Sequence, residues 1–181
     1  MGLDLLDPAL VGVVGTPTCV EATYANLPTE TLTQRTCGRG REGMGFRPDA
    51  SHILYEKLIK SIKLQLNNDG ASPIDTISVR VRDSSNAIVN TFGTMSATTL
   101  TASFAEYTFD TTEIQLSAGD FITLEYDFGI PPVQVRVFQT GTDNYIANAT
   151  SLVCTTTGMA TWNGWYDFDY FWLWLEAVYC E

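Results

Sequence analysis

Hydrophobic and polar residues alternate with a period of two along most of the chain after Lys57. This pattern is typical of β-strands that bury one face. In the first such stretch the predicted buried face is Leu58, Ile62, Leu64 and Leu66, with Lys63 and Gln65 on the other face. In the second it is Ile77, Val79 and Val81. Helical periodicity is nearly absent, so the pattern predicts an all-β protein.

Further strands are predicted at 87–92, 106–109, 121–128, 133–139, 145–153 and 166–179. Turn residues such as Asn67–Gly70, Asp83–Asn86 and Ser117–Asp120 separate the stretches. Counting one or two further strands before residue 48, eight to ten short strands with turns at regular intervals indicate a two-sheet antiparallel β-sandwich. A jelly roll is the preferred type, and an immunoglobulin-like sandwich is the alternative.

The stretch 166–179 is apolar on both faces of the single strand predicted there. One face is expected in the core. The other is then covered by the N-terminal part of the chain or a neighbouring subunit, or it is an exposed aromatic binding surface, because an open patch of this kind invites aggregation.

Residues 1–47 differ from the rest and predict an extended N-terminal arm, followed by a sandwich domain over 48–181. This part contains three prolines, a threonine-rich stretch and the run Cys37–Gly43, which is rich in Gly and Arg. We expect the arm to engage a neighbour, with its apolar segment adding as a strand to an adjacent sheet. The residues assigned to this contact are Ala9, Leu10, Val11, Val13, Val14, Arg39 and Arg41.

Composition excludes several classes of protein. The 181 residues are 45% hydrophobic and 17% charged, which rules out wholesale disorder. The net charge of −11 opposes binding to nucleic acid or to anionic lipid. The longest early apolar stretch, 9–15, is too short to span a membrane, and its flank is acidic where a signal peptide is basic. We therefore expect no membrane span and no signal peptide.

Four cysteines, Cys19, Cys37, Cys154 and Cys180, lie toward the two ends of the chain. Without a close-spaced pair, a zinc site is disfavoured against disulfides or buried free thiols. Of the three possible disulfide pairings, the local choice joins Cys19 to Cys37 and Cys154 to Cys180. Disulfides would indicate an oxidising setting or a thermophilic host.

The segments that carry a resemblance to a known family are 58–66, 77–83, 99–101 with 107–109, and 116–124. In their order they resemble jelly-roll modules similar to carbohydrate-binding modules, which occur in bacterial and archaeal surface proteins and in phage tail and fibre proteins. The resemblance covers about 130 residues from His52 onward. It implies a non-enzymatic adhesion or structural module.

The sequence contains little evidence of an enzymatic site. The run Gly38–Gly43 matches the sequence motif of a dinucleotide-binding loop but lacks the flanking strand and helix. We therefore expect it to be a flexible hinge. His52 is the single histidine, and no nucleophile motif accompanies it, so a strand-edge position is expected. The acidic pairs 110/113, 125/127 and 167/169 are expected on the surface. We predict that the protein is not an enzyme.

Two binding sites are candidates. A structural calcium ion, which takes oxygen ligands from loops, is one. Its candidate ligands are Asp127, Asp143, Asn144, Asp167 and Asp169. A glycan site is the other, because aromatic faces stack on sugar rings, although core or interface packing of the same residues is the competing interpretation. Its candidate residues are Trp162, Trp165, Tyr166 and Asp167.

The sequence thus predicts a structural subunit of an extracellular assembly that forms homo-oligomers or joins other subunits. A virion surface or tail component is preferred, and a filament subunit is the second form. A stand-alone carbohydrate-binding module is the alternative function, and fold-level analogy carries both predictions.

Overall fold

The structure, a computed structural model, describes residues 19–25, 32–37, 43–68, 76–110, 113–127, 133–139, 149–154, 165–167, 171–173 and 175–181. In these residues it contains β1 (Glu21–Ala25), β2 (Leu32–Cys37), β3 (Gly43–Pro48), β4 (Leu58–Asn67), β5 (Thr76–Arg82), β6 (Ile88–Ser96), β7 (Ala105–Phe109), β8 (Ile114–Gln115), β9 (Phe121–Asp127), β10 (Val133–Gln139), β11 (Ala149–Cys154), β12 (Trp165–Asp167), β13 (Phe171–Leu173) and β14 (Glu176–Cys180). A short 3-10 helix, η1 (Ala97–Thr99), follows β6.

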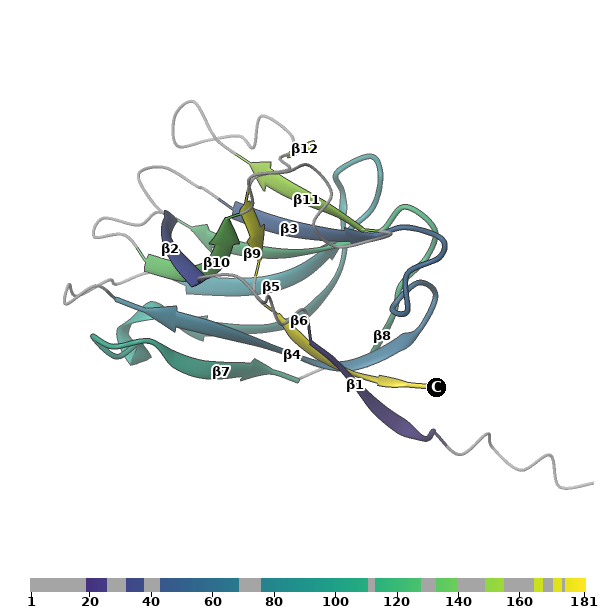
Figure 1. The fold of residues 1–181 in the computed structure, drawn as a ribbon, viewed down its shortest axis with the longest axis horizontal. Coiled ribbons are helices and arrows are strands. Elements are labelled where there is room, and N and C mark those ends of the chain that lie inside the picture. Colours follow the sequence, from purple (N-terminus) through teal and green to yellow (C-terminus); the bar gives the residue numbers. More distant parts are fainter. Residues whose placement is uncertain are drawn as a thin grey trace, which may run out of the picture.

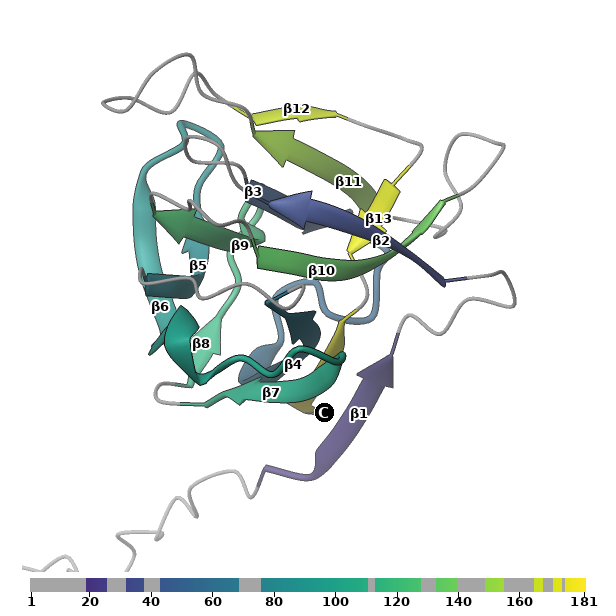
Figure 2. The ribbon, with the colours of Figure 1, turned by 90° about the vertical axis from the view of Figure 1, so that its left-hand side faces the viewer.

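Two antiparallel sheets pack against each other as a β-sandwich, which confirms the predicted fold class (Figure 1). Sheet A has the order β1-β14-β4-β10-β13, with β2 beside β10 and with β7 and β8 beside β4. Sheet B has the order β12-β11-β3-β9-β5-β6. Turned by 90°, the molecule shows β6 as its left-hand border and β1 projecting below (Figure 2). None of the helical turns in the described part of the chain is long and apolar enough to cross a membrane.

The core lies between the sheets and comes from alternate residues of their central strands. Sheet A contributes Ile59, Ile62, Leu64, Leu66, Leu175, Ala177 and Tyr179, and sheet B contributes Met44, Phe46, Ile77, Val79, Val81, Ile122, Leu124 and Tyr126. The face predicted for β5 is therefore confirmed. Burial of each such aliphatic side chain stabilises the fold by roughly 1.5–3 kcal/mol.

Strand β4 departs from the expected alternation at its start. Ile59 is buried and Leu58 only half-buried, although Leu58 was predicted on the buried face. The cause is an irregularity in the pairing of β4 with β14, where Val178 lies opposite Ser61 but Tyr179 lies opposite Ile59. The extra residue, Lys60, shifts the alternation by one position.

Two predicted turns are confirmed by their hydrogen bonds. The Asp83 carboxylate accepts from the Ser85 N–H, the Ser85 hydroxyl and the Ala87 N–H, which closes the turn between β5 and β6. In the turn before β9, the Asp120 N–H donates to the Ser117 carbonyl at 3.1 Å, and Gly119 has φ +85°, a conformation that favours glycine.

The prediction of one strand over 166–179 is wrong. The described parts of this segment are three strands: β12 pairs with β11 in sheet B, whereas β13 and β14 pair with β10 and β4 in sheet A. The chain changes sheets here, so the alternation of one short strand does not continue into the next. When these three strands are counted as one, apolar residues fall on both of its apparent faces. In β14 the buried face is Ala177 and Tyr179.

Three strands, β1, β2 and β3, come from the N-terminal part of the chain and join the two sheets, whereas residues 1–47 were predicted as an extended arm with one or two strands. Strand β3 lies between β9 and β11, and its Met44 and Phe46 are in the core. The body of the sandwich therefore extends well before the expected boundary at residue 48. Of the expected arm, the residues before Cys19 and those at 26–31 and 38–42 lie outside the described residues.

Candidate functional site

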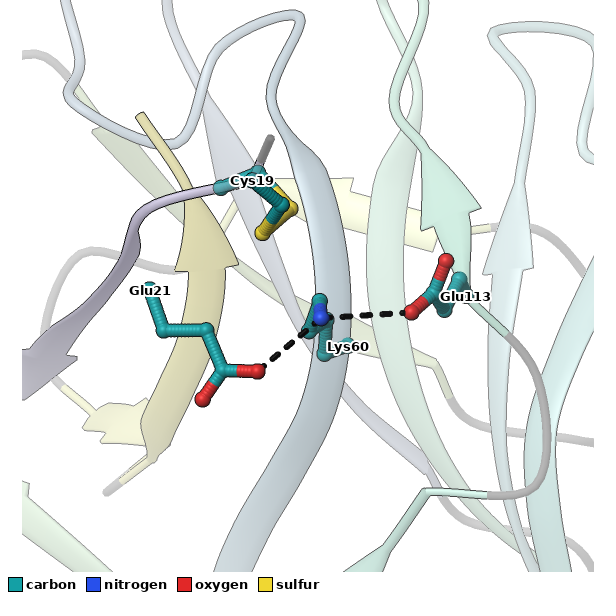
Figure 3. The surroundings of a disulfide bond; sticks show 5 residues. Cys19, Glu21, Lys60 and Glu113 are labelled. Atoms are coloured by element: carbon teal, nitrogen blue, oxygen red, sulfur yellow. Dashed lines mark hydrogen bonds and ion pairs between the residues drawn. A yellow bond between two sulfur atoms is a disulfide. The ribbon is translucent and has the colours of Figure 1, made fainter. Parts of the chain in front are cut away.

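A disulfide between Cys19 and Cys180 joins the entrance of the first strand to the end of the last strand (Figure 3). The two residues are 161 positions apart, and their Cα atoms lie 5.1 Å from each other. The local pairing predicted for these cysteines is therefore wrong. The reason is topological, because β1 and β14 are neighbours in sheet A and bring the ends of the described chain together.

Backbone pairing reinforces this connection. Strand β1 runs antiparallel to β14, with Glu21 opposite Cys180 and Ala25 opposite Glu176. Beyond the strand ends, the Glu181 N–H donates to the Val20 carbonyl at 3.0 Å. We call the group Cys19, Glu21, Tyr24, His52, Lys60 and Cys180 the arm junction, since residues 1–18 enter the folded body through it.

Lys60 crosses the outer face of sheet A at this junction. Its Nζ lies 2.9 Å from Glu21 Oε1 and 3.5 Å from Glu113 Oε1, and Figure 3 shows it between these two carboxylates. The hydrogen bond to Glu21 raises the pKa of Lys60, so the amine stays charged at neutral pH. The bridge is exposed and adds little to stability, but it links β1 to β4 across β14.

Lys63 repeats this arrangement one step along the same face. Its Nζ lies 2.8 Å from Glu176 of β14 and 3.6 Å from Glu106 of β7, and the hydrogen bond to Glu176 raises the pKa of Lys63. These two lysines and four glutamates together carry an excess of two negative charges.

His52 packs beneath β1 and is buried, whereas a strand-edge position was predicted. It lies in the turn between β3 and β4, and its Nδ1 accepts from the Leu54 N–H at 3.1 Å. Its ring meets Tyr24 of β1 and Phe46 of β3 edge to face, with centroids at 4.8 and 5.2 Å. Burial lowers the pKa of His52, against an opposing effect of Asp49, and the neutral imidazole helps to hold β1.

A second charged group lies on the outward side of sheet B, around Glu125 of β9. The Glu125 carboxylate is completely buried. It accepts from Arg80 Nη1 at 2.5 Å, from Arg82 Nε at 2.6 Å and from the Thr123 hydroxyl at 2.8 Å. Arg82 also donates to the Asn86 carbonyl, so the cluster connects β9 to the turn after β5.

The environment of Glu125 fixes its charge. Burial alone would raise the pKa of Glu125, but the hydrogen bonds and charges of Arg82, with Thr123 and Arg80, outweigh burial and lower it. Every oxygen of the carboxylate is engaged by these neighbours, so the group fits a structural role and offers no free base. The prediction that Glu125 lies on the surface is therefore wrong. The signal for this cluster in the sequence is the pair Arg80 and Arg82, which share the face of β5 opposite its apolar residues.

Most residues assigned to binding sites lie outside the described residues. These are Ala9, Leu10, Val11, Val13, Val14, Arg39, Arg41, Asp143, Asn144, Trp162 and Asp169. Trp165, Tyr166 and Asp167 form β12, an edge strand that pairs with Leu152–Cys154 of β11. Cys37 ends β2 and Cys154 ends β11.

The structure does not bring the calcium candidates Asp127 and Asp167 together. Asp127 ends β9 and Asp167 ends β12, and the order of sheet B places β3 and β11 between these strands. Three strand spacings amount to about 14 Å. Among the described residues, no group of three His, Cys, Asp or Glu side chains is arranged to hold a metal ion.

Comparison with models of protein families and with curated proteins finds no match to this chain.

Proposed function

We propose that the protein is a non-enzymatic structural subunit of an extracellular assembly, such as a virion surface or tail component or a filament, and that it assembles through residues 1–18. The observation that carries this proposal is the disulfide between Cys19 and Cys180, which fixes the base of that segment to the body.

The junction suits a segment that transmits contacts between subunits. A flexible tail needs no anchor, whereas a segment that holds a neighbour must resist being pulled away with its strand. Here β1 is held by a disulfide, by pairing along its length with β14 and by the packing of Tyr24 on His52. The disulfide holds the start of β1, the strand pairing holds its backbone, and the aromatic contact holds its Tyr24 side chain.

An extracellular location is supported by the chemistry of the anchor. Disulfides persist in oxidising environments and are rare where cells keep thiols reduced. A structural disulfide at the point that secures assembly fits a protein that works outside the cytoplasm.

The test compares the full chain with a variant that lacks residues 2–17 and keeps Cys19. Light scattering gives the mass in solution, and circular dichroism reports folding. We expect the full chain to form a multimer of the 19.9 kDa subunit and the shortened variant to stay folded with a lower mass. A deletion of the whole predicted arm, residues 1–47, would not serve as the test, because it removes most of β3 from the core.

A conservative variant, Thr16→Ser with Thr18→Ser, serves as the matched control and should assemble like the wild type. A full chain that is monomeric at every concentration, or a shortened variant that assembles normally, would contradict the proposal.

A further inference from the structure

Strand β6 presents an open, uncharged edge with two exposed aliphatic side chains at one border of sheet B. Within the described residues it pairs with β5 alone, and its sequence Ile88–Ser96 contains no charged residue. Ile88 and Val89 are 50% and 51% exposed and are two of the four large hydrophobic residues that the described chain exposes in this way. Exposed sheet edges are commonly protected by charge or proline.

The pairing of β6 with β5 limits what can bind there. Gly93 and Thr91 lie opposite consecutive residues of β5, and so do Asn90 and Ile88. Phe92 and Val89 are therefore extra residues in β6, and such bulges bend an edge strand. A bent edge accepts one short strand and opposes the growth of a long, flat sheet.

The chain contains one short segment that matches this edge, residues 9–14 with the sequence Ala-Leu-Val-Gly-Val-Val. It is uncharged like the edge, and its apolar side chains match the exposed Ile88 and Val89 of β6. Six residues in a strand cover about 20 Å, which lies within the length of the nine-residue β6.

Residues 9–14 join the folded body through Cys19, which lies just before β1. In both Figure 1 and Figure 2 the start of β1 projects past the other strands, and Figure 2 shows β6 along a different border. From Cys19 back to Ala9 the chain reaches at most about 36 Å, while a folded body of this length is roughly 40 Å across. A neighbouring copy is thus the accessible partner.

We infer that residues 9–14 of one copy add as a strand beside β6 of a second copy and cover Ile88 and Val89. The donor segment and the receiving edge are different surfaces of the same chain, so the contact is head-to-tail and continues into a ring or a filament. This inference rests on the proposed function, because it names the surface that receives the arm.

The test uses charge in the full chain. One variant carries Ile88→Lys and Val89→Lys, a second carries Val11→Glu and Val13→Glu, and a third combines all four. Ile53→Lys is the matched control, since Ile53 is an aliphatic residue of the β3–β4 turn with 49% exposure. Sedimentation gives the dissociation constant of each variant.

We expect each charged pair to weaken association about tenfold or more and the combined variant to recover most of the loss, because opposite charges then face each other. The control should associate like the wild type. If the β6 variant associates normally while the arm variant does not, the arm binds elsewhere; this inference then fails and the proposed function stands. If neither variant nor removal of residues 2–17 changes the mass, both fail.

A second measurement leaves β6 untouched and so does not depend on the folding of the β6 variant. A photo-reactive benzoylphenylalanine at position 13, in a mixture of isotope-labelled and unlabelled chains, should crosslink to residues 88–96 of another copy. Crosslinks that map elsewhere, or only within one chain, would overturn the inference.

Discussion

The imidazole of His52 is kept neutral in a buried aromatic setting, so acid should weaken the fold through this residue. Its pKa is lowered by burial, and a group with a lowered folded pKa contributes stability above its unfolded pKa and loses it as pH falls. The loss should begin as pH drops below about 6.5. Protonation of Nδ1 also removes the acceptor for the Leu54 N–H.

His52→Asn keeps an acceptor near the Leu54 N–H but has no titrating group. We expect the urea midpoint of the wild type to fall between pH 7.5 and 5.5 and that of the variant to fall less. Equal slopes for the two proteins would contradict this account of His52.

Glu125 should be far more important for stability than the exposed acids. Glu125→Gln leaves the buried guanidinium of Arg82 without its charged partner, and a loss of about 3 kcal/mol in the free energy of unfolding is expected. Ser78→Ala is the matched control, because Ser78 lies opposite Glu125 on β5 and its buried hydroxyl has no partner among the described residues. Urea unfolding of both variants tests the prediction, and equal losses would disprove it.

The lowered pKa of Glu125 adds a second acid-sensitive step. Its contribution is present above the ordinary glutamate pKa of about 4.3 and is lost as pH falls further. The step should be absent in Glu125→Gln.

At the level of the element, the disulfide should dominate the stability of β1. Opening it with Cys19→Ser and Cys180→Ser frees a loop of 161 residues, and a loss of roughly 2–5 kcal/mol is expected. Thr23→Ser in the same strand should have little effect. Thermal unfolding of the three proteins gives the comparison, and an unchanged midpoint in the cysteine variant would show that the disulfide adds no stability.

A strand could be predicted where its apolar and polar residues alternate in the same way as its buried and exposed side chains. In β5, apolar residues mark the core face, and the prediction is confirmed. Strand β3 could not be located from the sequence because two of its residues, Gly43 and Gly45, have no side chain to complete the alternation of apolar and polar residues. The segment 166–179 has the pattern of a single strand because a change of sheet leaves no trace in local alternation.

The arm junction could be predicted only in part for the same reason. Cysteine content indicated disulfides, but the pairing of Cys19 with Cys180 follows from the adjacency of β1 and β14, which no local pattern encodes. The burial of Glu125 likewise depends on neighbours from another strand.

At the scale of the whole molecule, net charge should oppose assembly. Each copy carries −11, so copies repel one another when salt is low. Raising ionic strength from 0.01 M to 0.1 M shortens the screening length from about 30 Å to about 10 Å. We expect the dissociation constant measured by sedimentation to fall over this range. A rise would mean that attraction between opposite charges drives the contact.

The meeting of Cys19 and Cys180 also decides how the subunit bears mechanical load. Tension applied between residues 1–18 and the C-terminal Glu181 passes through the covalent bond between the sulfurs, and the strands from β1 to β14 are outside that path. A subunit pulled in this way keeps its hydrogen-bonded sheets unloaded. Under force-clamp stretching from these two ends it should extend without unfolding until the disulfide is reduced.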